Sequence, residues 1–255
     1  MSIRFGPAGL GPTKTAIETL EKYHELGFKA CEIAFTYSNY IKPEATKKIK
    51  EKAEQLDIEL SIHGSYFINL NAQEKEKLEA SKKRIIDACK IGELLGVKCL
   101  VFHPGFFGKL VRKEAYGNIK KAILEIQQTL RKNRWKIQIA PETMGKINVF
   151  GSVEEISQLV KETGCSFCID LAHILARDKK VDYKKVVRLF PQKDWHVHFS
   201  GIVYGEKGEK HHRKTEKEEW KNLLKNLPKD KNIRIINESP AMVEDSLDGL
   251  MLYKK

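Results

Sequence analysis

The stretch GVKCLVFHPG, residues 96–105, contains one complete unit of the expected fold. Gly96 ends an amphipathic helix predicted over residues 73–95, because glycine tolerates the backbone conformation that follows a helix. The apolar run from Lys98 to His103 then predicts a strand. Seven similar apolar runs alternate with amphipathic runs along the chain. They predict strands over residues 3–5, 31–35, 58–63, 136–142, 167–170, 195–199 and 233–238.

Eight strands that alternate with helices indicate an α/β protein built as a parallel (βα)8 TIM barrel. The strands are almost wholly apolar, as expected for parallel strands that are buried on both faces. The chain has 255 residues without a linker or low-complexity break, so we expect a single domain over residues 1–255. The other helices are predicted over residues 13–26, 43–56, 152–163, 182–189 and 216–227. One more helix follows the strand over residues 98–103 and runs to about residue 132, and a short last helix follows the eighth strand.

Six consecutive predicted strands end in, or carry near their ends, a histidine or an acidic residue. In a parallel barrel the carboxyl ends of the strands meet on one face, where active sites lie. An unpaired charge is costly to bury, so apolar strands rarely finish this way by chance. We therefore expect one shared site made of His63, His103, Glu142, Asp170, His198 and Glu238.

Imidazole and carboxylate groups in one site suit zinc, manganese or iron, and not calcium or magnesium alone. Further donors follow nearby: His173, three residues after Asp170, and then Glu209 and His211. Nine donors suffice for three ions. Sites with several ions cleave phosphate esters, because the ions activate water and stabilise the attacking and leaving oxygens.

The composition fits this chemistry without proving it. The chain carries 46 Lys and Arg against 34 Asp and Glu, a formal net charge of +12. That balance favours a polyanionic partner such as nucleic acid, and a lysine-rich thermophile surface explains it equally well. No apolar stretch of about 18 residues predicts a membrane span. The odd number of cysteines, five, and the lack of a secretory signal predict a reducing, cytoplasmic location, with Cys165 and Cys168 as buried structural thiols.

Five segments carry a resemblance to a known family: HGSYFINL at 63–70, VFHPG at 101–105, CIDLAH at 168–173, EKHH at 209–212 and NESP at 237–240. Through them, and over nearly the whole chain, the sequence resembles the endonuclease IV proteins, AP endonuclease family 2. The resemblance implies a DNA-repair enzyme that cuts duplex DNA 5′ to an abasic site, leaves a 3′-hydroxyl and trims damaged 3′ ends. We expect it to act as a monomer.

The resemblance also implies three zinc ions, with manganese or iron as an alternative at one position. The first would be held by His63, His103 and Glu142, and Glu142 would bridge to the second as the central catalytic residue. Asp170, His198 and Glu238 would complete the second set. The third ion would be held by His173, Glu209 and His211, where Glu209 replaces the aspartate of the family.

The expected contacts to DNA are Tyr66, Lys146, Lys210 and Arg213. Tyr66 matches the family tyrosine that fills the gap left by a flipped-out abasic nucleotide. The loop at residues 37–40 lacks the basic residue that many members use to enter the DNA. Two further histidines are open: we interpret His212 as a solvated loop residue or a phosphate contact, and His196 as a structural or supporting neighbour of His198.

A sugar isomerase or epimerase of the xylose-isomerase-like barrel type is the main alternative. Those enzymes hold a single divalent ion with a Glu, Asp, His, Glu quartet, which Glu142, Asp170, His198 and Glu238 would also fit. The remaining donors separate the two functions: an isomerase has little need of the additional histidines, whereas phosphodiester cleavage uses several ions directly.

Overall fold

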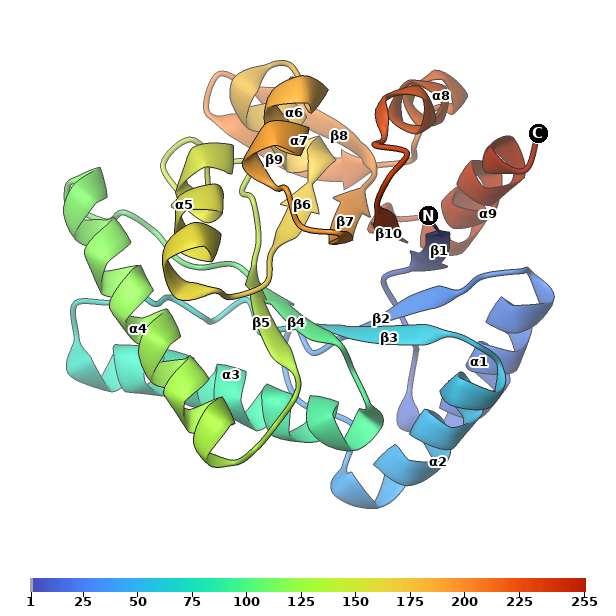
Figure 1. Ribbon diagram of the computed structural model, residues 1–255, viewed down its shortest axis with the longest axis horizontal. Helices are drawn as coiled ribbons and strands as arrows, with labels where there is room; N and C mark the ends of the chain where they lie inside the picture. Colours follow the sequence, from blue (N-terminus) through green and yellow to red (C-terminus); the bar gives the residue numbers. More distant parts are fainter. Residues whose placement is uncertain (1) are drawn as a thin grey trace.

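The computed structural model describes residues 2–255, and it is an α/β barrel of parallel strands (Figure 1). Within that range the barrel strands form two four-stranded sheets, in the orders β2-β3-β4-β5 and β1-β10-β7-β6, and a separate two-stranded sheet lies outside the ring. The strands are β1 (Ile3–Pro7), β2 (Ala30–Ala34), β3 (Glu59–His63), β4 (Cys99–Phe102), β5 (Gln138–Pro141), β6 (Cys168–Asp170), β7 (Asp194–Phe199) and β10 (Asn232–Asn237). The predicted eight-stranded barrel is confirmed.

Two seams join the sheets into a ring. At one seam Lys29 N–H, just before β2, donates to Phe5 O of β1 at 3.1 Å. The approach is so close that a Cβ on Gly6 would lie 1.7 Å from Ala30 O, and only glycine fits there. At the other seam a parallel bridge joins Glu142, just after β5, to Cys168 of β6.

Helices cover the outside of the ring (Figure 1). They are α1 (Ala16–Glu25), preceded by a 3-10 turn at Thr13–Thr15, α2 (Pro43–Gln55), α3 (Lys75–Leu95), α4 (Arg112–Lys132), α5 (Val153–Thr163), α7 (Tyr183–Leu189), α8 (Lys217–Asn226) and α9 (Met242–Tyr253). Side chains such as Ile85, Ile119 and Ile156 pack between these helices and the strands. All five cysteines are buried and free, as predicted for Cys165 and Cys168. Across residues 2–255 no helix has the length and apolar character of a membrane span.

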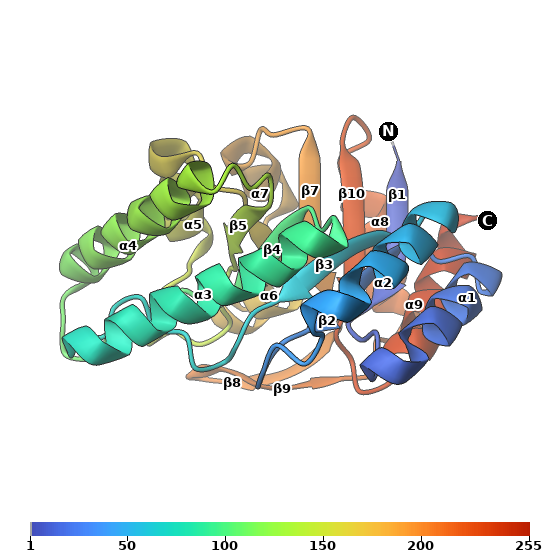
Figure 2. The ribbon, with the colours of Figure 1, turned by 90° about the horizontal axis from the view of Figure 1, so that it is seen from below.

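Two elements at the carboxyl face were not predicted. Helix α6 (Leu171–Asp178) begins directly after β6, and a hairpin of β8 (Gly201–Gly205) and β9 (Gly208–Arg213) follows β7. Figure 2 shows the hairpin lying across the carboxyl ends of the strands, with the N-terminus at the opposite end of the barrel. Both elements therefore border the face on which the predicted ligands meet.

Candidate metal centre

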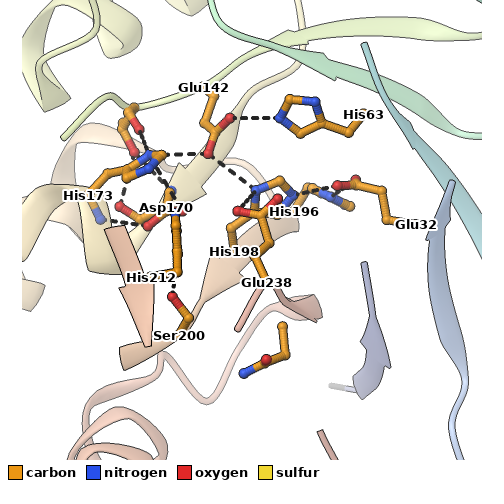
Figure 3. Close-up of polar contacts among 12 residues, drawn as sticks. Glu32, His63, Glu142, Asp170, His173, His196, His198, Ser200, His212 and Glu238 are labelled. Carbon is orange, nitrogen blue, oxygen red and sulfur yellow. Dashed lines mark hydrogen bonds and ion pairs between the residues drawn. The ribbon is translucent and has the colours of Figure 1, made fainter. Parts of the chain in front are cut away.

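The structure brings the six strand-end residues together at the carboxyl face. His63 and Asp170 are the last residues of β3 and β6, and His103, Glu142 and Glu238 follow β4, β5 and β10 directly. His198 is the fifth residue of β7. Figure 3 shows Glu142 at the middle of the group, with histidines on either side.

Glu142 is fully buried and presents each carboxylate oxygen to different histidines. Its Oε2 lies 3.4 Å from His63 Nε2 and 3.2 Å from His103 Nε2. Its Oε1 lies 3.2 Å from His198 Nδ1 and 3.3 Å from His173 Nδ1. One carboxylate thus separates two sets of nitrogen donors, which is the arrangement of a group that bridges two cations.

The set on one side of Glu142 consists of His63 and His103. Ligand atoms of His63, His103 and Glu142 all lie within 4.8 Å of one another. The other ring nitrogen of His63, Nδ1, lies 2.8 Å from Gly64 O, so the backbone orients the ring and leaves Nε2 directed at Glu142. The His103 side chain is 27% exposed and is the part of this set that solvent reaches.

The quartet on the other side consists of Glu142, Asp170, His198 and Glu238, whose ligand atoms also lie within 4.8 Å of one another. His198 Nδ1 lies 3.3 Å from Glu238 Oε2. Asp170 Oδ2 is buried and has no hydrogen-bond partner within residues 2–255. A buried carboxylate oxygen without a donor is costly, and a bound cation would compensate it. The donor set and this unsatisfied oxygen fit a divalent ion.

A third group surrounds His173, at the start of α6. Asp170 caps this helix by accepting from His173 N–H at 2.6 Å, and the ring Nδ1 of His173 lies 3.0 Å from Thr143 O. The opposite nitrogen, Nε2, lies 3.4 Å from Glu209 Oε2. The residue that completes the cluster with Asp170 and His173 is His212.

The expectation that His211 belongs to this third group is therefore corrected, because His212 takes its place. The register between β8 and β9 slips: Tyr204 pairs with Glu209 and Val203 with His211, so Lys210 is an extra residue in β9. Such a bulge reverses the alternation of side chains along a strand. His212 consequently shares the inward face of Glu209, while His211 is exposed. With this change, the structure brings eight of the nine predicted ligands to one place.

The histidines and carboxylates strongly perturb one another's pKa values. Burial by itself would raise the pKa of Glu142, but the surrounding histidines, His198 first, hold it well below its usual range. Burial and His198 act in the same opposition on Glu238, whose pKa is lowered to about 2. For His63, burial would lower the pKa, and its contact with Glu142 raises it to about 9. At neutral pH, Glu142 and Glu238 are therefore anionic and His63 is cationic before any ion binds.

Metal binding is expected to release protons at neutral pH, because a ligating imidazole must be neutral. His63, with a pKa of about 9 against 6.5 when unperturbed, is protonated at pH 7. Its charge stabilises the metal-free fold fully below about 6.5, and this contribution is lost as pH rises through about 9. Calorimetric zinc titrations in two buffers of different ionisation enthalpy should show about one proton released per ion at this set. Identical heats in both buffers would mean that no proton is released, and they would contradict the assignment of His63 as a metal ligand.

The expected DNA contacts lie at different distances from this centre. Tyr66 is half-exposed, and its ring centroid lies 5.6 Å from that of His103 and 5.7 Å from that of His63. Lys146 and Lys210 are exposed on the rim of the face. Arg213 is engaged within the chain, since both its terminal nitrogens contact the Glu219 carboxylate, at 3.0 and 2.8 Å.

Comparison with known proteins fits this geometry. A profile described as the xylose isomerase-like TIM barrel matches residues 20–251 of the chain. The chain belongs to this family. Among the curated relatives, an uncharacterized protein of Methanocaldococcus jannaschii is 34% identical over 98% of this chain and 97% of its own length. An endonuclease 4 homolog of Dictyostelium discoideum is 27% identical over 72% of this chain, which corresponds to 38% of that longer protein.

Solved structures with the same fold have more than one activity in their names. Endonuclease IV of Thermus thermophilus superposes with a TM-score of 0.72 at 22% identity, over 98% of this chain and 97% of its own. A D-tagatose 3-epimerase-like protein gives the same TM-score and identity, over 98% of this chain and 96% of its own. The fold alone does not separate the two activities, so the separation has to come from the side chains of the site.

Proposed function

We propose that the protein is a zinc-dependent endonuclease that cleaves the phosphodiester 5′ to an abasic site in duplex DNA, leaves a 3′-hydroxyl and trims damaged 3′ ends. The observation that carries the proposal is the pair of donor sets on opposite oxygens of Glu142, with His63 and His103 on one and His198 on the other. A site for a single ion needs one of these sets.

The protein residues would perform distinct parts of the reaction. When bound at these donor sets, divalent ions would supply a water of lowered pKa and would neutralise the charge that develops on the phosphate. Glu142 fixes the distance between the two sets, because its one carboxylate faces both. His103 and Glu238 are the partly exposed members, with side chains 27% and 19% accessible, and they line the approach of the phosphate.

The third group supports the same chemistry. Asp170, His173 and His212 place ligand atoms within 4.8 Å of one another beside the quartet, and Glu209 lies against His173. We infer that these residues hold a third ion, which would offset the charge on the leaving oxygen. Glu209 is one methylene longer than the aspartate expected in the family, and the His212 ring reaches the group from the bulged strand.

An aromatic cluster beside the centre suits an opened base pair. Tyr37, Tyr66 and Phe67 are 76%, 50% and 60% exposed. A group of adjoining apolar side chains that is open to solvent usually marks a binding surface. The Tyr37 ring packs edge-to-face on Tyr66 and Phe67, with centroids 5.9 and 6.4 Å away. Unpaired bases stack on such rings, and Tyr66 borders the metal centre where the base-free sugar would lie.

Epimerisation of a sugar is the second candidate, because the quartet alone matches a one-ion site. A cavity of about 170 Å³ beside the centre is lined by Glu32, His63, Tyr66, His212 and Glu238, among others. It is smaller than the ~300 Å³ at which pockets for drug-sized ligands begin, so it suits a group of about one sugar ring. A base-free deoxyribose and a free ketose both meet that limit.

One experiment separates the two candidates. The zinc-loaded protein is incubated with a duplex that contains a single tetrahydrofuran abasic analogue, and the products are resolved on a denaturing gel. The proposal predicts incision 5′ to the analogue with a 3′-hydroxyl, and an intact undamaged duplex. In parallel, the protein is incubated with ketohexoses, whose C3 epimers are separated by chromatography. Epimerisation without incision would replace the proposed function by the second candidate.

DNA binding is expected to weaken as salt rises, because phosphate contacts release counterions. Lys146 and Lys210 are exposed on the rim, and an antiparallel bridge between Lys146 and Gly208 holds this loop to the hairpin. With about four phosphate contacts the affinity should fall about 10²-fold between 50 and 200 mM salt. Fluorescence anisotropy on catalytically inactive protein measures this slope. Lys146→Ala should reduce the slope by about one, whereas a salt-independent affinity would count against a DNA partner.

A further inference from the structure

Glu32 is a carboxylate inside a strand that is otherwise apolar. It lies at the centre of β2, between Cys31 and Ile33, and it is fully buried. Its register partner on β3 is Ser61, whose hydroxyl donates to Glu32 Oε2 at 2.8 Å. Neither the family motifs nor the strand-end pattern points to it. A charge buried in a barrel interior is costly, so its partners indicate what it does there.

Two histidines of β7 compensate the charge of Glu32. His196 Nε2 lies 3.0 Å from Glu32 Oε2, and His198 Nε2 lies 3.0 Å from Glu32 Oε1. The two histidines are separated by one residue, so both side chains point to the same face of the strand, toward the barrel interior. Figure 3 shows this histidine pair between Glu32 and Glu142.

His198 is the residue that connects Glu32 to the metal centre. Its Nδ1 faces Glu142 Oε1 and Glu238 Oε2, at 3.2 and 3.3 Å, while its Nε2 faces Glu32. The Nε2 contact is not aligned as a hydrogen bond, and within residues 2–255 neither Glu32 Oε1 nor His198 Nε2 has another hydrogen-bond partner. The two unsatisfied atoms thus face each other at 3.0 Å.

We propose that Glu32 is a positioning residue for the quartet of Glu142, Asp170, His198 and Glu238. It accepts the Nε2 proton of His198, which fixes the tautomer and directs the Nδ1 lone pair to an ion held by the carboxylates. Histidines that bind metals usually give their other N–H to a carboxylate or carbonyl in this way. Ser61 and His196 hold the second oxygen of Glu32 and keep the carboxylate in place.

The inference rests on the quartet binding an ion, as proposed above, and not on which reaction that ion serves. Its test is the binding of Co²⁺ alone by the metal-depleted full chain, followed by visible absorption and by competition with a chelator. Glu32→Ala is expected to weaken the Co²⁺ site by about 10²-fold and to change its spectrum, and Glu32→Gln by about 10-fold, since the amide oxygen still accepts one proton. Cys31→Ala is the matched control, because Cys31 is equally buried on the other face of β2.

A second readout separates positioning from a plain structural role. Loss of packing lowers the melting temperature with and without Co²⁺ alike, whereas loss of positioning also reduces the increase in melting temperature that Co²⁺ produces. Wild-type Co²⁺ affinity and spectrum in a folded Glu32→Ala protein would overturn the proposal, and if that variant does not fold, the same result in Glu32→Gln would. Failure of the wild-type chain to bind Co²⁺ would overturn the quartet together with Glu32. Failure to cut DNA would leave both standing.

Discussion

Replacing Glu142 with alanine should lower incision at an abasic site by at least ~10²-fold. Loss of a residue that only supports a metal ligand costs about 10- to 100-fold in activity, and Glu142 is expected to be a ligand itself. Each oxygen of this carboxylate faces a different donor set, so a single substitution loosens both sets at once. It also removes the carboxylate that His63 and His198 contact at 3.4 and 3.2 Å. Incision of the tetrahydrofuran duplex measures the rate, and elemental analysis measures the bound zinc.

A matched substitution makes this result specific. Glu206→Ala removes an exposed carboxylate from the hairpin turn, on the same face of the molecule, and should leave both rate and zinc content unchanged. Glu142→Gln preserves the shape of the side chain and serves if the alanine protein fails to fold. Near-normal incision by a folded Glu142 variant would show that the bridging role is wrong.

The sequence predicted the barrel and most of its site because both depend on simple periodicity. Strands of a parallel barrel are apolar along their length and open at their carboxyl ends, so a polar residue that ends an apolar run is visible without any structure. His63, His103, Glu142, Asp170 and Glu238 all stand at such positions. Convergence of the strand ends then brings them together, whatever the details of the loops.

The third group could not be predicted as well, because it depends on a loop conformation. Which of His211 and His212 points inward is decided by the extra residue Lys210 in β9, and a bulge leaves no mark in a strand without apolar side chains. Helix α6 was missed for a related reason: its first residues continue the apolar run of β6, and Asp170 both ends the strand and caps the helix.

Glu32 and Arg213 show what a residue type alone leaves open. Glu32 lies in mid-strand and not at a strand end, so its function is visible only once β7 is placed across the barrel from β2. Arg213 is a basic residue in a loop beside the site, which suggests a phosphate contact, but its guanidinium is paired with Glu219 at the start of α8. Its contact with DNA would require breaking that pair, whereas Lys146 and Lys210 are exposed.

The double substitution His63→Ala/His103→Ala should abolish incision while the chain still binds metal. It removes the nitrogen donors from Glu142 Oε2 and leaves the ligand atoms of the quartet in place. We expect the zinc content to fall by about one ion per chain and incision to fall at least ~10²-fold, because an in-line displacement uses ions on both sides of the phosphate. A one-ion sugar epimerase would keep its metal in this variant, since the quartet holds it.

The control removes two imidazoles that lie outside the centre. His24 is exposed on α1 and His211 is exposed on β9, so His24→Ala/His211→Ala should retain full zinc content and full incision. Loss of zinc in the control would return His211 to the ligand set and contradict the bulged register of β9. Retained incision in the His63/His103 variant would mean that the quartet and its ion suffice for cleavage, and the assignment of Glu142 as a bridge between two ions would be wrong.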